Sequence, residues 1–291
     1  KGSEGKIIVD GDPRGNRLIS GQKETIPPAD GGQIITTIDY FLQYSTEKYL
    51  SEAVKKHQAK SGQAIIMDCI NGDILAMASV PTFNPNQWQD SSSTDRRIRS
   101  VLDIFEPGST FKLITLAAVL EEGIVSPKTS LHVPETYKLY NRTISEAHDR
   151  DPDDPDTKTV TAIMEESLNV GTTLLALKLG EERFYRYMKD FGFDKKTGIE
   201  LPGESKGLLR HVDNWSGVDI GTMSFGQGVA VTGIQLAAAL SAIANDGLYV
   251  KPRIVHYVSN HEGASRKTVP IKKTLQVISP ETSYQVRMIM E

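Results

Sequence analysis

The sequence predicts a globular domain that mixes α-helices with β-strands. Two apolar runs, 63–68 and 73–79, flank Asn71-Gly72, a pair that supplies the positive φ angles of a tight hairpin turn. Residues 110–120 are apolar nearly all round, which is typical of a helix buried in the middle of a domain. Two more helical stretches fill residues 160–180, on either side of a polar break.

The remaining elements are weaker but fall in a clear order. Residues 1–35 are rich in Gly, Pro and charge, and they contain too little apolar material for a core of their own. The elements expected before the hairpin are strand-like pieces at 6–10 and 17–20, a strand over 32–38, and a helix over 40–60 that Asp39 caps. Those expected after residue 180 are a loop over 191–204, an apolar helix over 232–245 ending at Gly247, and a strand-like run over 249–255 in which Pro252 indicates an edge or a bend.

Composition excludes several classes of function. The chain has 291 residues, 38% hydrophobic and 24% charged, with a net charge of −4 and no cluster of Lys and Arg. This balance argues against nucleic acid as a partner. The single cysteine, Cys69, cannot form an intrachain disulfide, and no run of 18 apolar residues predicts a membrane span.

No metal or cofactor is expected. The Asp-rich run 149–158 lacks the spacing of an EF-hand, so we interpret it as a solvated loop. Gly226-Gln-Gly228 has no P-loop or dinucleotide-binding pattern around it and is interpreted as a turn. The histidines show no His-x-x-x-His spacing; they are His57, His132, His148, His211, His256 and His261.

Ser109 and Lys112 form a Ser-x-x-Lys pair at the start of the buried helix. Residues i and i+3 share a helix face, so the amine can reach the hydroxyl and take its proton. The chain contains four such strings, but only this one opens a buried helix. Taken alone, the pair is more simply explained by Ser109 as a helix N-cap, with Lys112 extending to solvent.

Ser167-Leu-Asn169 is the one Ser-x-Asn string in the chain. It falls in the break between the two helical stretches of residues 160–180. A second hydroxyl can relay a proton, and an amide can orient a substrate carbonyl. An ordinary turn between two helices remains the alternative, because Ser and Asn both favour turns.

These strings resemble a known family. Glu106-Pro-Gly-Ser-Thr-Phe-Lys112 is similar to the active-site signature of the class B penicillin-binding proteins, the monofunctional transpeptidases that cross-link bacterial peptidoglycan. The resemblance runs from about residue 5 to the last residue. Further segments match the family in the expected order: 67–79 with 81–86, 166–171, 197–204 and 224–228.

The resemblance implies an α+β fold of the penicillin-binding and β-lactamase-like type, with an antiparallel sheet flanked by helices. Residues 1–35 would be a linker or the edge of an N-terminal pedestal module, and 36–291 the transpeptidase domain with a helical lobe at about 113–220. By position, Ser109 is the acylated nucleophile and Lys112 its general base. Ser167 would relay a proton and Asn169 would hold the substrate carbonyl, while the backbone N–H of Ser109 forms half of an oxyanion hole.

One family motif, Lys-(Ser/Thr)-Gly on an edge strand, has no convincing match. Lys60-Ser-Gly62 precedes the nucleophile, and Lys196-Thr-Gly198 lies in a segment that resembles a family loop. We therefore expect the motif beyond Glu291, which leaves the sheet of this chain incomplete. An N-terminal membrane anchor is likewise expected before Lys1.

The resemblance predicts a serine D-Ala-D-Ala transpeptidase that β-lactams acylate. Its expected partners are peptidoglycan stem peptides, β-lactams, a membrane glycosyltransferase and other cell-wall synthesis proteins. Its expected location is the outer face of the bacterial cytoplasmic membrane. Two alternatives stay open, a serine β-lactamase of the same superfamily and a β-lactam sensor that keeps the fold as a pseudoenzyme.

Overall fold

The computed structural model describes residues 2–9, 23–151, 153–260 and 266–291. The strand-like piece expected at 17–20 lies outside the described residues. The chain divides into two compact units. The first comprises Lys1–Thr37 and Val255–Pro270, and the second comprises Ile38–Ile254 and Ile271–Glu291.

The first unit consists of short antiparallel strands. Strand β1 (Lys6–Val9) pairs with β2 (Lys23–Ile26), and β13 (Val255–Ser259) pairs with both β3 (Gln33–Thr36) and β14 (Arg266–Thr268). Every residue of β1, β2 and β3 is exposed. These strands therefore build no core of their own, as the composition of residues 1–35 indicates.

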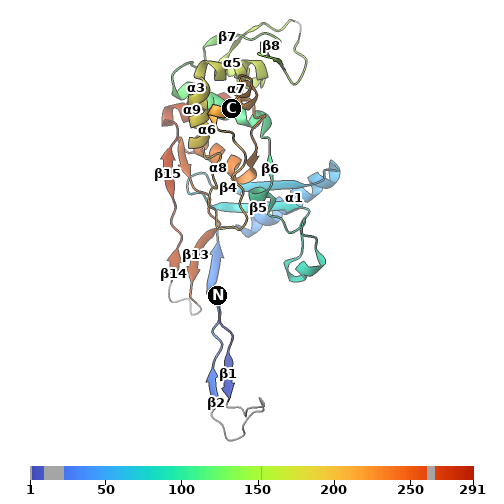
Figure 1. Ribbon diagram of the computed structural model, residues 1–291, viewed down its shortest axis with the longest axis vertical. Helices are drawn as coiled ribbons and strands as arrows, with labels where there is room; N and C mark the ends of the chain where they lie inside the picture. The colour runs from blue at the N-terminus through green and yellow to red at the C-terminus, as the bar shows by residue number, and fades with distance from the viewer. Residues whose placement is uncertain (1, 10–22, 152, 261–265) are drawn as a thin grey trace. The chain divides into compact units, whose positions relative to one another are not determined.

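The second unit contains the helices and the remaining strand pairs (Figure 1). Its α-helices are α1 (Tyr40–Lys56), α2 (Arg99–Leu102), α3 (Lys112–Glu121), α4 (Val160–Glu165), α5 (Asn169–Leu179), α6 (Glu181–Asp190), α7 (Asp219–Ser224), α8 (Gly233–Ala244) and α9 (Pro280–Met290). Its strand pairs, all antiparallel, are β4 (Gly62–Met67) with β5 (Ile74–Val80), β6 (Ile104–Phe105) with β11 (Val231–Thr232), β7 (Ser130–His132) with β10 (Thr157–Thr159), β8 (Thr136–Leu139) with β9 (Arg142–Ser145), and β12 (Leu248–Val250) with β15 (Lys273–Gln276).

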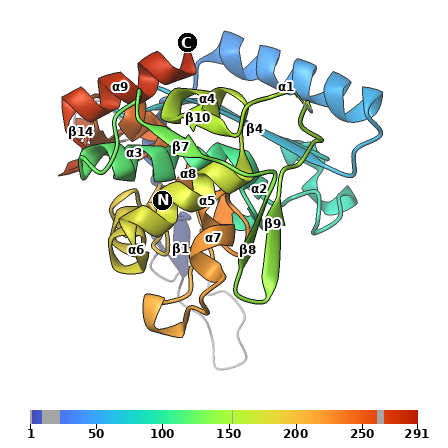
Figure 2. The same ribbon diagram turned by 90° about the horizontal axis from the view of Figure 1, so that it is seen from above.

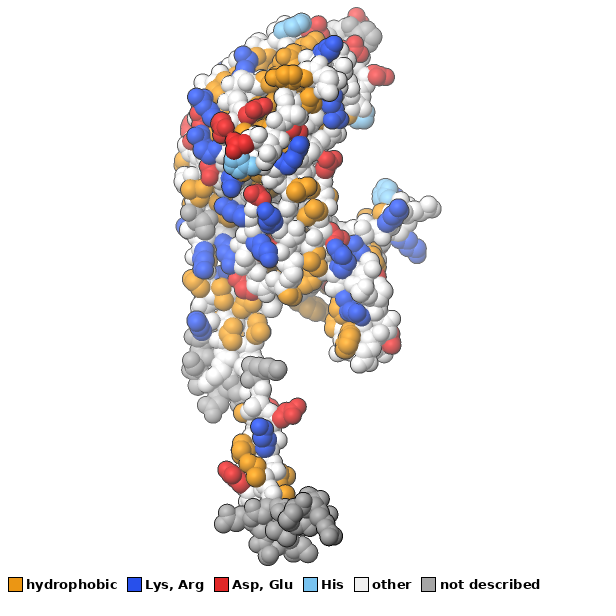
Figure 3. Space-filling model, viewed as in Figure 1, with side chains coloured by type: hydrophobic (Ala, Val, Ile, Leu, Met, Phe, Trp, Pro, Cys, Tyr) orange, Lys and Arg blue, Asp and Glu red, His pale blue; other side chains and the backbone are white. Residues whose placement is uncertain are grey.

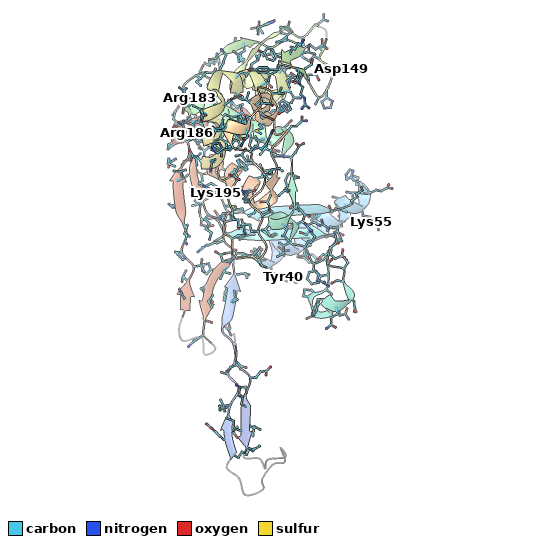
Figure 4. The ribbon with its side chains drawn as sticks, viewed as in Figure 1. Tyr40, Lys55, Asp149, Arg183, Arg186 and Lys195 are labelled. Carbon is cyan, nitrogen blue, oxygen red and sulfur yellow. The ribbon has the colours of Figure 1, made fainter. Side chains whose placement is uncertain are left out.

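Helix α3 lies at the centre of the larger core. Its residues are buried on nearly every side, because α5, α6 and α9 all pack against it (Figure 2). Its C-terminal end is fixed to α6, where Arg183 and Arg186, labelled in Figure 4, both contact the Glu122 carboxylate. Burial on this scale holds the residue that begins the helix, Lys112, in a fixed place.

The β4–β5 hairpin lies between α1 and α8 (Figures 1 and 2). A second, smaller core forms where Ile74 of β5 meets Val101 of α2, Ile234 of α8 and Ile199. Outside these cores, acidic and basic side chains are interspersed over the face of the unit seen in Figure 3. No helix in the described part of the chain is long and apolar enough to cross a membrane.

Most predicted elements are confirmed, with local corrections. The hairpin turns at Asn71-Gly72, and Asp39 caps α1 through a 2.9 Å bond from the N–H of Leu42. The strand expected over 249–255 was wrong in its middle: the chain leaves β12 at Val250 and enters β13 only at Val255, and Pro252 lies in the gap. Residues 113–220 also hold the short strands β7 to β10 beside their helices.

Candidate active site

Ser109 lies in a tight 3₁₀ turn, Gly108–Phe111, that leads directly into α3. Gly108 adopts a φ of +59°, a conformation that costs glycine little. The Ser109 side chain is exposed, and it makes no hydrogen bond to any residue that the structure describes. The hydroxyl is therefore presented at the tip of a buried helix.

A second segment, 224–228, locks this turn from the other side. The Gly108 N–H donates a 3.1 Å bond to the Gly226 carbonyl. Gly226 has a φ of +79°, and a Cβ there would stand 2.2 Å from the Gly108 oxygen, so only glycine allows this approach. The Gly228 N–H donates to Glu106 Oε1 at 2.7 Å. Two residues that closely precede Ser109, Glu106 and Gly108, are thus tied to one distant loop.

Lys112 is buried, with 1% of its surface exposed, and its amine faces Ser167. Nζ donates to Ser167 Oγ at 3.1 Å and also to the Ser167 carbonyl. Burial lowers the pKa of Lys112 from its usual 10.5 to about 8, while the negative charge of Glu146 acts in the opposite direction. A substantial neutral fraction near pH 8 lets this amine accept a proton.

The turn that contains Ser167 and Asn169 is held in a strained shape. Ser167 has a φ of +54°, which is unfavourable for a residue with a Cβ. Asn169 begins α5, and its Nδ2 donates to the Ser145 carbonyl at 3.0 Å. Its backbone N–H donates to Glu146. Two residues at the end of β9 therefore fix Asn169 through both its side chain and its backbone.

Ser109 and Ser167 line the same cavity, of about 310 Å³. Acidic residues contribute much of the remaining wall, together with His148 and Arg150. The loop that follows β9 supplies one side of it and includes Asp149, which is labelled in Figure 4. Across the wall, Lys158 bonds to Asp154 and, at 2.7 Å, to Glu166. These ion pairs stiffen the segment that leads into Ser167.

A neighbouring cavity of about 300 Å³ lies on the other side of Glu146 and Ala147. Asn169 lines this second cavity together with Gln227 and Arg142. Glu146 lines both cavities, and its carboxylate also accepts a hydrogen bond from the N-terminus of α5. The site thus consists of two adjoining spaces.

Of the four predicted residues, two are in direct contact and the other two line the cavities beside them. Lys112 contacts Ser167, Ser109 opens onto the cavity that Ser167 lines, and Asn169 faces the neighbouring space. Sequence reasoning missed Glu146, which lies 23 residues from Asn169 and matches no motif by itself. Its role depends on the β8–β9 hairpin, whose turn has a positive φ at Tyr140 instead of at a glycine.

Neither Lys-Thr-Gly nor Lys-Ser-Gly string lies within this site. Thr197 and Gly198 belong to a loop in which both backbone N–H groups donate to the Glu204 carboxylate, at 2.6 and 2.9 Å. Gly62 is the first residue of β4, at the far end of the hairpin from Asn71. Among the described residues, no group of three or more His, Cys, Asp and Glu side chains is arranged to hold a metal ion.

Comparison with known proteins agrees with this geometry. The sequence matches the family described as the penicillin binding protein transpeptidase domain over residues 62–291. It is 34% identical to penicillin-binding protein PbpB of Mycolicibacterium smegmatis, over 98% of this chain and 44% of that protein. It is 36% identical to stage V sporulation protein D of Bacillus subtilis, over 100% of this chain and 45% of that protein.

Solved structures show the same fold. Penicillin binding protein 3 of Mycobacterium tuberculosis in its apo form has a TM-score of 0.85 and 30% identity, covering 97% of this chain and 66% of that one. The same protein complexed with ampicillin gives a TM-score of 0.85 at 30% identity, over 97% of this chain and 65% of that one. The chain itself spans less than half the length of the two curated relatives above. It belongs to the family of penicillin-binding protein transpeptidase domains.

Proposed function

We propose that this chain is the acyl-transfer domain of a class B penicillin-binding protein that cross-links peptidoglycan. Ser109 Oγ attacks the carbonyl carbon of the D-Ala-D-Ala bond, Lys112 takes the hydroxyl proton, and an ester to Ser109 forms. The peptide bond breaks and D-Ala leaves with a proton relayed through Ser167. An amine of a neighbouring stem peptide then attacks the ester, forms a new amide and returns the proton to Ser109.

The observation that most strongly supports this proposal is the environment of Lys112. A lysine can act as a base near neutral pH only when its charged form is disfavoured, and here burial lowers its pKa to about 8. Its amine already bonds to Ser167 Oγ at 3.1 Å, beside the cavity onto which Ser109 opens. Asn169 is the group that would hold the peptide carbonyl. The N–H of Ser109 supplies one oxyanion donor, because the turn before α3 has no side-chain cap.

The proposed substrates and partners follow from the family. The donor is a stem peptide ending in D-Ala-D-Ala, and β-lactams acylate the same serine because they resemble that end. Relatives in this family include a protein named as a probable peptidoglycan D,D-transpeptidase in Pseudomonas aeruginosa. We place the protein at the outer face of the bacterial cytoplasmic membrane, working with a membrane glycosyltransferase and other cell-wall proteins. The reaction requires no cofactor.

Covalent labelling tests the proposal. A fluorescent β-lactam should attach to the full-length protein and should fail to attach to the Ser109→Ala variant. The matched control is Ser45→Ala, because Ser45 and Lys48 form another Ser-x-x-Lys string on the surface helix α1. That control should label normally. Normal labelling of Ser109→Ala would overturn the assignment.

The fate of the bound β-lactam separates the enzyme classes. A transpeptidase releases the acyl group slowly, whereas a serine β-lactamase hydrolyses it rapidly and turns over. Cross-linking of a D-Ala-D-Ala peptide to an added amine would distinguish a transpeptidase from a sensor that only binds. Rapid turnover, or acylation without any transfer to an amine, would contradict the proposed function.

A further inference from the structure

Glu146 is the charged residue that links the two halves of the candidate active site. We propose that Glu146 is a positioning residue, whose carboxylate holds the Ser167–Asn169 turn in place beside the Lys112 amine. This inference rests on the proposed function and adds to it a residue that lies outside the Ser-x-x-Lys and Ser-x-Asn strings. It concerns how the Ser167–Asn169 turn is held in place and how a nearby charge affects the protonation of Lys112.

The Glu146 carboxylate accepts hydrogen bonds from two consecutive backbone N–H groups, those of Asn169 and Val170, the latter at 3.0 Å. These are the first two residues of α5, whose N-cap residue, Leu168, has no side-chain oxygen to offer. A carboxylate at a helix N-terminus is favoured by the helix dipole as well as by its hydrogen bonds. Glu146 therefore does from a distance what an N-cap residue does locally.

The contact with Glu146 and its neighbour fixes the turn that contains Ser167 and Asn169. Ser145, the neighbour of Glu146, accepts the Asn169 side chain at 3.0 Å. Ser167 lies two residues before Asn169 and has a strained φ of +54°. Strained residues keep their shape only when the surrounding contacts fix them. The end of β9 is thus the anchor against which the Ser167–Asn169 turn is set.

The charge of Glu146 acts on Lys112 in the direction that raises its pKa, against the larger effect of burial. The other charged or titratable groups around the cavity are His148, Asp149, Arg150, Asp151, Asp154 and Glu166, with Lys158 behind them. Asp154 is paired with Arg150 and Lys158, and Glu166 with Lys158, so their charges are largely compensated. Glu146 is the carboxylate whose charge Lys112 feels.

The test is the pH profile of acylation by a labelled β-lactam in the full-length protein. Glu146→Gln keeps the size of the side chain and removes its charge. The rising limb of the rate should move to lower pH by about half a unit to one unit, because Lys112 loses the charge that raises its pKa. The maximum rate should fall about tenfold or more, because an amide cannot accept from both N–H groups with both of its ends.

Glu146→Asp separates charge from reach. It keeps the charge, so its rising limb should stay within about a quarter of a pH unit of wild type. It is one methylene shorter, so its maximum rate should still fall. This variant also keeps the proposal testable if Glu146→Gln does not fold.

Glu121→Gln is the matched control. Glu121 is another carboxylate that holds a helix N-terminus, since it accepts from the Ser279 N–H at 2.9 Å at the start of α9. It lies at the other end of α3 from Lys112, so its loss should lower the melting temperature and leave the pH profile where it is.

If wild-type protein acylates and Glu146→Gln matches it in both maximum rate and rising limb, the positioning role is wrong and Glu146 is only a helix cap. A limb shifted equally in Glu146→Asp would also overturn it. If the wild-type protein does not acylate at all, the proposed function itself has failed.

Discussion

The N-termini of α3 and α5 both border the candidate active site. They differ in whether a side chain accepts hydrogen bonds from their backbone N–H groups. At α5, the carboxylate of Glu146 accepts hydrogen bonds from the backbone N–H groups of Asn169 and Val170. At the turn that opens α3, no described side chain caps the N–H groups, and the one at Gly108 is taken by a backbone carbonyl. Both ends carry the positive pole of a helix dipole.

The difference shows how one fold can use two similar helix ends for different purposes. At the N-terminus of α5 the Glu146 carboxylate already supplies a negative charge, so this helix end is a fixed structural element. The α3 end keeps an open donor next to Ser109, which is where the proposed reaction develops negative charge on the substrate oxygen. The following changes test this contrast, beginning with the largest expected effect.

Lys112→Met should reduce acylation about 10²- to 10⁴-fold, the usual contribution of a positioned base. Folding stability should not fall with it. Below pH 8 the lysine is charged in both folded and unfolded states, and burial makes that charge unfavourable only in the folded one. The variant should therefore melt at or above the wild-type temperature at pH 7, and this difference should shrink as the pH rises from about 8 towards 10.5.

Lys158→Met is the control for removing a buried lysine. Lys158 is paired with Asp154 and Glu166, so its loss leaves two carboxylates without their cation. This variant should melt well below wild type, while its acylation rate falls much less than that of Lys112→Met. Equal loss of acylation in both variants would contradict the distinction between a base and a structural ion pair.

The acylation rate of the wild-type protein should rise with pH and reach half of its maximum near pH 8. The reason is that the proposed base works only when neutral, and burial lowers the Lys112 pKa to about 8. Stopped-flow labelling from about pH 6 to about pH 10 measures this directly. A rate that is flat or falling between pH 7 and pH 9 would rule Lys112 out as the base.

Gly226→Ala should disturb the α3 end and leave the α5 end intact. A Cβ at Gly226 would lie 2.2 Å from the Gly108 oxygen at a φ of +79°. We expect a loss of more than about 3 kcal/mol of stability, or a displaced Ser109 with weak labelling. Gly123→Ala is the matched control: Gly123 also has a positive φ, +62°, but its Cβ would meet nothing within 4 Å, so about 1 kcal/mol should be lost. Thermal melts and labelling of both variants provide the comparison.

The smallest effect is expected for Thr159→Ala. Thr159 caps α4 locally, accepting from the Ala162 N–H at 3.1 Å, just ahead of the Ser167 turn. Its loss should cost about 1 kcal/mol, as is usual for an N-cap. Because its hydroxyl carries no charge, the pH profile of acylation should stay unchanged. A shifted profile would mean that any loosening of this region alters Lys112, whatever its charge.

The sequence predicted the scaffold of the site better than its connections. The all-round apolar run 110–120 predicted a buried helix, and α3 is one. Spacing alone could not select Ser109 among four Ser-x-x-Lys strings, but the apolar run that follows it marked the one string that opens a buried helix. The resemblance to a family then supplied the role of Ser109 as a nucleophile. Glu146 was out of reach, because its contact with α5 is created by chain topology and not by a local pattern.

Some missed elements did carry a signal. Helix α6 buries Phe184, Tyr187 and Met188, which recur at helical spacing, and Glu181 begins its first turn. The β8–β9 hairpin was harder to predict, because its turn places Tyr140 at a φ of +52° and contains no glycine. Local chemistry predicts an element well only where it agrees with the tertiary contacts.

The contact between Gly226 and Gly108 also bears on how the protein is made. Glu106 and Gly228, which bond across this contact, are 122 positions apart in the chain. During synthesis, α3 emerges from the ribosome long before the loop that locks its first turn. Ser109 therefore lacks the contact that fixes its turn until more than a hundred further residues have been added. The contact that fixes its turn cannot form until Gly226, in the second half of the chain, has been added.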